Sequence, residues 1–317
     1  MSRPEGVFTR VWSRVAGAGI VVLLHIALAP DIHAESIALI NSYDFAPYNA
    51  AIAGFLNDCS DNVVEYDLRG EANGNSGLIQ DITSGDPDLI VAIGVLAAEF
   101  SQQELNDTPT LYVMVPKPRA YALTGRNIAG ISLDISIERQ LSVYRSMVSD
   151  LKVLGVIYDP QKTGKIVEEA QRVAALQGVA LHTRAVTSRK DVPPALRALL
   201  KEQQIDALWM IPDETVVTPE SFQFLLLTSF EHKLPFLAAS DIFVKVGALA
   251  SLTPDYTDLG RQGCELARAF TSGKVSLASM NEILPAKINL SINLKTARKI
   301  GLSISEEVIE TAAVVYR

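Results

Sequence analysis

The sequence predicts an α/β fold with two doubly wound parallel-sheet lobes joined by a hinge. From Ser36 onward, short and continuously apolar runs alternate with longer amphipathic segments, and the second half of the chain repeats this scheme. Continuous apolar strands that alternate with helices are typical of parallel sheets covered on both faces. No Pro/Gly/Ser-rich linker separates the halves, so we expect short connecting segments that act as a hinge.

The bulk composition fits two folded domains. The 317 residues are 48% apolar and 20% charged, which is typical of a globular protein of about two domains. The formal net charge is -8 and Lys and Arg form no cluster, so a nucleic-acid-binding surface is not expected.

Residues 1–34 predict a secretory signal peptide. Three arginines precede the apolar run 15–29, and Ala34 offers a small residue for cleavage. An uncleaved membrane anchor is the alternative, but the run is shorter than the roughly 20 residues that span a bilayer. We therefore expect export, and no lipid anchor, because no cysteine lies directly after the run and the two cysteines are Cys59 and Cys264.

The first half predicts four strands, at 36–40, 62–68, 88–93 and 110–115. The run 62–68 does not alternate cleanly and is expected nearer a sheet edge. A helix is expected at 48–59.

The second half begins with a helical stripe whose apolar residues lie three and four positions apart: Ile137, Leu141, Tyr144, Met147 and Val148. The expected strands and helices then alternate: strand 153–159, helix 163–177, strand 179–186, helix 191–203 and strand 206–211.

Two later helix starts have nearly the same sequence. Thr218-Pro219-Glu220 and Thr253-Pro254-Asp255 each offer a capping threonine, a proline at the first helical position and an acid in the first turn. The second helix is expected to end before Gly273. Gly260 and Gly263 lie on or beside its apolar stripe, so we expect this helix to pack close to a neighbour.

Cys59 and Cys264 are the two cysteines of the chain. They form a disulfide if they meet in an oxidising compartment, or remain two buried thiols on separate helices. The sequence leaves both possibilities open.

The sequence offers little evidence for catalysis. His182 and His232 are far apart and have no further Cys or His at metal-ligand spacing, so no metal or cofactor is expected. Neither a nucleophile elbow nor a phosphate loop is present. Asp213 and Glu214 follow a buried strand and leave an exported hydrolase as the weaker alternative. The expectation is therefore a protein that is not an enzyme.

Candidate ligand-binding residues follow the carboxyl ends of the predicted strands. In open parallel sheets, ligands bind beyond these ends, where helix N-termini present unpaired N–H groups. The candidates are Tyr43, Asp44, Gly94, Val95, Lys117, Tyr158, Asp159, Asp213, Glu214, Ser240 and Asp241. Each one alone is also consistent with a turn or cap residue, and their convergence is the hypothesis.

An ordered series of short motifs spans nearly the whole chain after residue 34. It consists of Asp88–Gly94 with Ala97-Ala98, Asn127–Ser132, Gln140-Leu141, Leu154–Pro160, Asp206–Leu208 with Asp213, Gly247-Ala248 with Asp255-Tyr256, Leu259–Arg261, Ile288–Leu290, Thr296-Ala297 and Ile300–Leu302. Taken in this order, the motifs resemble those of the exported solute-binding proteins of ABC transporters with a type I periplasmic-binding fold, in the group that includes tryptophan and other aromatic amino-acid binders.

The resemblance implies a noncatalytic, periplasmic and monomeric protein whose two lobes close around a small molecule and deliver it to an ABC permease in the inner membrane. It also implies the lobe boundaries: 35–134 with 241–285 in the first lobe, and 135–240 with 286–317 in the second. Asp255 and Tyr256 would then lie near the hinge, as capping residues in preference to ligand contacts. A periplasmic ligand sensor for a signalling receptor is the alternative on the same fold.

Three departures from the family pattern bear on the ligand. Val95 and Ala129 stand where the family commonly has hydroxyl residues, and Pro116–Arg119 stands where an Asp-Pro is usual. Two hydroxyls and an acid are lost and two cations are gained near the expected cleft. We therefore expect an amino-acid-like, aromatic or anionic ligand.

Overall fold

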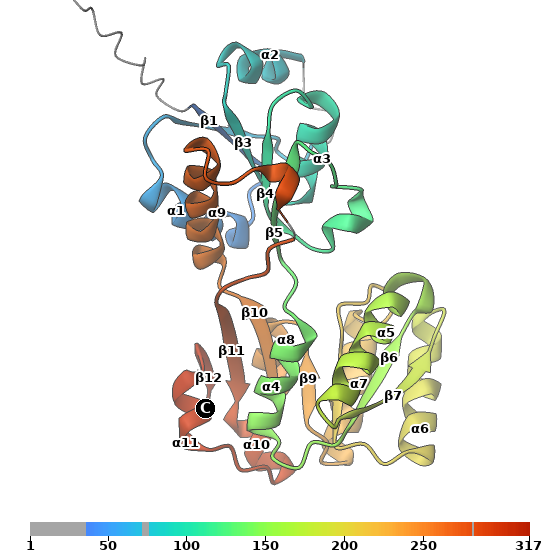
Figure 1. The fold of residues 1–317 in the computed structure, drawn as a ribbon. Helices are drawn as coiled ribbons and strands as arrows, with labels where there is room; N and C mark the ends of the chain where they lie inside the picture. Colours follow the sequence, from blue (N-terminus) through green and yellow to red (C-terminus); the bar gives the residue numbers. More distant parts are fainter. Residues whose placement is uncertain (1–35, 72–75, 281) are drawn as a thin grey trace, which may run out of the picture. The chain divides into compact units, whose positions relative to one another are not determined.

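The computed structural model describes residues 36–71, 76–280 and 282–317 (Figure 1). The predicted signal peptide, residues 1–34, lies outside the described residues. In the part that is described, no helix has the length and apolar character needed to cross a membrane.

The first sheet is parallel throughout, with the order β2-β1-β3-β4-β5. Its strands are β1 (Ile37–Asn41), β2 (Val63–Asp67), β3 (Leu89–Ile93), β4 (Thr110–Val115) and β5 (Ile128–Ser132). The prediction that 62–68 lies near an edge is confirmed, since β2 is an edge strand and is the most exposed of the five.

Helices cover this sheet on both faces because alternate strand residues point to opposite sides. One face packs against α1 (Ala46–Asp58) and α9 (Tyr256–Thr271) through residues such as Leu39 and Val113. The other face packs against α2 (Ser76–Ser84) and α3 (Val95–Glu104) through residues such as Ile40 and Ala92.

The second sheet has the order β12-β11-β10-β9-β8-β6-β7 and is parallel except for the antiparallel pair β10–β11. Its strands are β6 (Val153–Tyr158), β7 (Ala180–Ala185), β8 (Ala207–Trp209), β9 (Phe236–Ala238), β10 (Ala250–Pro254), β11 (Ile288–Asn293) and β12 (Val314–Tyr316). The predicted two-lobed α/β architecture is confirmed.

Two apolar clusters cover the two faces of the second sheet. One includes α4 (Ile137–Met147), α5 (Pro160–Leu176), α10 (Leu294–Ile300) and α11 (Glu306–Thr311), and the other includes α6 (Val192–Glu202), α7 (Pro219–Glu231) and α8 (Asp241–Val246). Three 3₁₀ turns complete the described elements: η1 (Pro118–Tyr121), η2 (Arg189–Asp191) and η3 (Leu277–Ser279).

The chain passes between the two sheets three times: between β5 and α4, between β10 and α9, and between Ile283 and β11. The expected change of lobe at residue 241 is therefore corrected. Strand β10 pairs with both β9 and β11, so α8 and β10 belong to the second sheet and the chain changes sheet at Asp255.

The helix start expected at Thr253-Pro254 is wrong for the same reason. Thr253 lies opposite Asn289 in the β10–β11 ladder, and this tertiary pairing prevails over the local capping signal. Asp255 is the N-cap instead, because its Oδ1 accepts a hydrogen bond from Asp258 N at 3.0 Å. The matching start at Thr218 is confirmed, since Thr218 Oγ1 accepts from Ser221 N at 3.2 Å.

The third crossing segment is held by side chains on both sides. Arg139 of α4 donates hydrogen bonds to the carbonyls of Pro285 and Ala286 at 3.0 and 2.9 Å. Gln262 of α9 donates to Leu284 O and accepts from Ala286 N, both at 3.2 Å. The extended segment thus obtains from side chains the hydrogen bonds that a sheet would otherwise supply.

Helices α1 and α9 cross at backbone contact, side by side on one face of the first sheet (Figure 1). A Cβ on Gly260 would lie 1.8 Å from Ala51 O, and a Cβ on Gly54 would lie 2.0 Å from Thr257 O. A Cβ on Gly263 would lie 3.0 Å from Val113 Cγ2. The expected close packing of the Gly260–Gly263 helix is confirmed.

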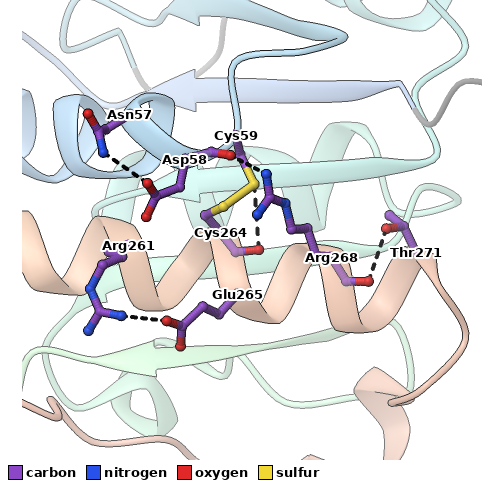
Figure 2. The surroundings of a disulfide bond; sticks show 8 residues. All are labelled: Asn57, Asp58, Cys59, Arg261, Cys264, Glu265, Arg268 and Thr271. Carbon is purple, nitrogen blue, oxygen red and sulfur yellow. Dashed lines mark hydrogen bonds and ion pairs between the residues drawn. A yellow bond between two sulfur atoms is a disulfide. The ribbon is translucent and has the colours of Figure 1, made fainter.

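A disulfide joins the same two helices. Cys59, which follows the last turn of α1, is bonded to Cys264 in α9, with the two Cα atoms 5.8 Å apart (Figure 2). Arg268, one turn further along α9, donates a hydrogen bond to Asp58 O. The structure thus decides between the two possibilities that the sequence left open for the cysteines.

We predict that Gly260→Ala lowers the free energy of unfolding by about 2–4 kcal/mol, because the new methyl group would overlap a backbone oxygen. Gly164→Ala in α5 is the matched control. Its Cβ would meet nothing closer than 4.0 Å, so it should raise stability by about 0.5–1 kcal/mol. Urea unfolding measures both, and equal effects of the two substitutions would refute the close crossing.

We also predict that the double variant Cys59→Ala/Cys264→Ala is about 2–5 kcal/mol less stable, since the bond closes a loop between positions 205 residues apart. A thermal melt with and without dithiothreitol checks this. The reductant should lower the melting temperature of the parent protein and leave that of the double variant unchanged.

Candidate functional site

Ser42, which follows β1, joins the carboxyl end of β3 to the start of α3. This buried hydroxyl donates a hydrogen bond to Ile93 O at 2.7 Å and accepts one from Ala97 N at 3.0 Å. Ala97 lies in the first turn of α3, so Ser42 fixes the start of that helix against the end of the sheet.

Gly94 and Val95 lie at the start of α3, as expected. Gly94 has φ 87°, and a Cβ there would lie 2.6 Å from the Tyr48 ring and 2.8 Å from Ser42 Oγ. The position therefore requires glycine. Val95 is the first residue of the helix, where amides have no partner within the helix and can bind an anionic or polar group.

Three aromatic rings gather beside this helix start. Tyr43, Phe45 and Tyr48 contact one another with ring centroids 5.2–6.0 Å apart. Tyr48 is buried, whereas Tyr43 and Phe45 are 41% and 47% exposed. Burial raises the pKa of Tyr48, and a hydrogen bond with the neighbouring Tyr43 raises it further. The Tyr48 hydroxyl therefore stays neutral at physiological pH.

Of these rings, only Tyr43 is among the residues predicted from the sequence, and Phe45 and Tyr48 are not. The spacing Tyr-x-Phe-x-x-Tyr just after a strand was the available signal. Asp44, its second candidate in this loop, is exposed and accepts a hydrogen bond from Asn49 Nδ2 at 2.8 Å. That contact gives Asp44 a local role in ordering the loop.

Lys117 lies in a strained connection between β4 and η1. Its φ is 45°, and Met114 and Ala122 nearby also have positive φ, at 67° and 53°. Such backbone conformations are costly for residues with side chains and are frequent at functional sites. Lys117 N donates to Asp134 Oδ2 at 2.7 Å, which holds the turn in place. No ion pair engages the Lys117 ammonium within the described residues.

The second sheet carries an acidic network beyond the ends of β6 and β8, where the sequence analysis placed Tyr158, Asp159 and Asp213. Tyr158 ends β6 and is half-buried. Asp159 caps α5, since its Oδ1 accepts from Gln161 N at 2.9 Å. Its Oδ2 accepts from Thr215 Oγ1 at 2.8 Å.

Asp213 is 1% exposed and accepts four hydrogen bonds. Its Oδ2 accepts from Asp159 N at 2.8 Å and from Thr163 Oγ1, and its Oδ1 accepts from the amides of Thr215 and Val216 at 2.9 and 3.1 Å. This carboxylate is fully used in joining the loop after β8 to the start of α5.

Glu214 has a different environment from Asp213. Its side chain is 84% exposed and pairs with Lys162 at 3.3 Å. The hydrolase alternative requires two carboxylates in one cleft. Asp213 is buried and Glu214 is exposed, so these two adjacent carboxylates do not share one.

Ser240 and Asp241 lie at the start of α8, beyond β9. Ser240 is the N-cap but makes no side-chain capping bond, and Asp241 is an exposed residue of the first turn. Burial raises the pKa of Tyr256 at the start of α9, and the charge of Asp241 adds to this effect. The described residues contain no cluster of three or more potential metal ligands.

The predicted residues therefore form two groups, one at the carboxyl end of each sheet. At the carboxyl end of the first sheet lie Tyr43, Gly94, Val95 and Lys117. At the carboxyl end of the second sheet lie Tyr158, Asp159, Ser240 and Asp241. Asp213 and Glu214 are in the second region, the first as a buried structural residue and the second as an exposed ion-pair partner.

In comparison with known proteins, residues 60–316 match a family model described as ABC transporter substrate binding protein. A curated relative, the tyrosine-binding protein of Clostridioides difficile (strain R20291), is 28% identical over 199 residues. The aligned part is 60% of this chain and 56% of that protein, so the match spans little more than half of the relative's length.

Solved structures show the same fold. The ligand-free, open structure of a substrate-binding protein with adhesive properties from Clostridium difficile superposes with a TM-score of 0.75, and an ABC domain in complex with L-Trp from Streptococcus pneumonia with 0.60. Each is 21% identical and covers 89% of this chain and 99% of its own.

We predict that Asp213→Asn lowers the free energy of unfolding by about 2–4 kcal/mol, because an amide can accept only at one of its two terminal atoms while four donors face this group. The neighbouring Glu214→Gln should remain within about 0.5 kcal/mol of the parent protein. Urea unfolding measures both, and a stable Asp213→Asn variant would contradict the structural role.

Proposed function

Because this chain belongs to the family of ABC transporter substrate-binding proteins, we propose that it captures a small aromatic or anionic molecule in a cleft between its lobes and delivers it to an ABC importer. Closure about the three crossing segments would remove water from the ligand, and the closed form would be the one that the permease recognises. The proposed location is the periplasm, after removal of residues 1–34.

The observation that carries the ligand class is the aromatic group beside the start of α3. Tyr43 and Phe45 are large apolar side chains that remain 41% and 47% exposed at the carboxyl end of a parallel sheet. Aromatic side chains in that position offer stacking surfaces for a planar ligand. The curated relative is named a tyrosine-binding protein and one similar structure holds L-Trp, which agrees with an aromatic ligand.

An acidic group on the ligand is supported by two features of the same edge. The first amides of α3 favour a negative group, and the Lys117 ammonium lies in the connection after β4 with no ion-pair partner within the described residues. We include Tyr158, Asp159, Ser240 and Asp241 of the second sheet as the opposing half of the proposed cleft. An amino group of the ligand would suit the exposed carboxylate of Asp241, since both oxygens of Asp159 already accept hydrogen bonds from the protein.

We further propose that the protein is not an enzyme. Asp213 has all of its acceptor capacity engaged by the protein, and Glu214 is solvated, so neither carboxylate is arranged as a general acid or base.

A thermal-shift screen tests the ligand class. L-tyrosine, L-tryptophan and 3-phenylpropionate should each be measured, together with mass spectrometry of small molecules released from the purified protein. A ligand at 100 times its dissociation constant adds about 2.7 kcal/mol of stability. If no aromatic compound stabilises the protein and no small molecule is released from it, the proposal is wrong.

We predict that Lys117→Ala weakens the binding of the most stabilising aromatic acid by about tenfold or more, since a charge-assisted hydrogen bond is lost. Alanine also carries a Cβ and retains the cost of the positive φ at this position, so the variant removes the ammonium and its aliphatic chain without relaxing the backbone. Calorimetric titration compares it with Lys274→Ala, an exposed lysine beyond α9. An unchanged affinity would contradict the anion-binding role.

A further inference from the structure

A hollow of 410 Å³ lies between α1 and the edge strand β2 of the first sheet. Its floor is formed by Leu39 and Asn41 of β1, one wall by α1 and the other by β2. This volume is in the range of small-molecule sites. The hollow is separate from the residues proposed for the cleft, none of which lines it.

The helical wall is a stripe of one polar and three apolar residues of α1. Asn49, Ile52, Ala53 and Leu56 are spaced at i, i+3, i+4 and i+7, so they lie on one face of α1. The other face of the same helix, with Tyr48, Ala51 and Phe55, packs into the core. Ile52 and Leu56 remain half-buried at the hollow and offer it a hydrocarbon surface.

The strand wall carries two carboxylates. Glu65 and Asp67 are two positions apart in β2 and therefore point to the same side of the sheet, about 7 Å apart along the strand. Both are exposed, and neither forms an ion pair within the described residues. Asp67 Oδ1 accepts from Arg69 N at 2.8 Å, which fixes that carboxylate at the mouth of the hollow.

Asn41 supplies an independent sign of a missing partner. It is 8% exposed, it lines the hollow, and its Oδ1 is buried without a hydrogen-bond partner among the described residues. A buried amide in this state is unusual in folded proteins. The Asn41 carbonyl oxygen at the floor of the hollow thus has no hydrogen-bond donor, and the carboxylates of Glu65 and Asp67 beside it have no cationic partner, among the described residues.

From this arrangement we propose that the hollow binds a short aliphatic diamine. One ammonium group pairs with Glu65 and the other with Asp67, and the methylene chain lies on Ile52 and Leu56. The ammonium group nearest Asn41 supplies the donor that its amide lacks. This site is additional to the proposed cleft and does not depend on the ligand that the cleft takes.

The test is a titration with 1,5-diaminopentane, followed by the methyl NMR signals of Ile52 and Leu56. These signals should shift saturably in the parent protein. The double variant Glu65→Gln/Asp67→Asn keeps the acceptor for Arg69 N and removes both charges, so its affinity should fall at least tenfold. The control double variant Glu104→Gln/Asp107→Asn removes two exposed acids from the same lobe and should retain the parental affinity.

Two further measurements complete the test. Magnesium chloride at the same total charge should leave the Ile52 and Leu56 signals in place, because the apolar wall favours a hydrocarbon chain. The melting temperature of each variant without diamine reports on its folding. The proposal is overturned if diamine produces no saturable shift, if magnesium produces the same shift, or if the charge-removed and control variants bind equally well.

Discussion

Helices α1 and α9 touch backbone to backbone, because Gly54 and Gly260 place no side chain between them. This crossing brings the segment after β10 back onto the first sheet, which the chain had left after β5. The disulfide between Cys59 and Cys264 locks the same pair of helices. A larger residue at either glycine would move α9 away from β4 and would open the core beneath it.

The crossing also positions the segments that connect the two lobes. Asp255 caps α9 directly after β10, and Gln262, two turns into that helix, holds the segment that returns to β11. Arg139 holds the same segment from the start of α4. The third crossing segment is thus bonded to helices of both lobes whose own positions are fixed by packing.

The acidic residues of the chain perform different tasks that composition alone does not separate. Asp213 and Asp159 accept hydrogen bonds from backbone amides and hydroxyls, and Asp258 forms ion pairs with Arg261 and Lys287. Glu65 and Asp67 line the hollow beside α1 and form no ion pair within the described residues. Burial raises the pKa of Asp258, but the bonds and charges of Arg261 and Lys287 outweigh burial and lower it. Only carboxylates with acceptor capacity left over from their protein partners are available to a ligand.

The sequence by itself determined the family and the strands β1 to β4 and β6 to β8, whereas it did not predict β5, β9, β11 or β12. Apolar runs such as 110–115 became buried strands because a continuous apolar segment is stable only when covered on both faces, and Gly260 and Gly263 already indicated a close helix contact. Only the tertiary structure decided the strand at Thr253-Pro254, the disulfide, the aromatic group around Tyr48 and the structural role of Asp213. The β10–β11 pairing joins Thr253 to Asn289, the disulfide spans 205 residues, and the amide of Asp159 lies 54 positions from the Asp213 carboxylate that it binds, and the local pattern carries no information about such pairings.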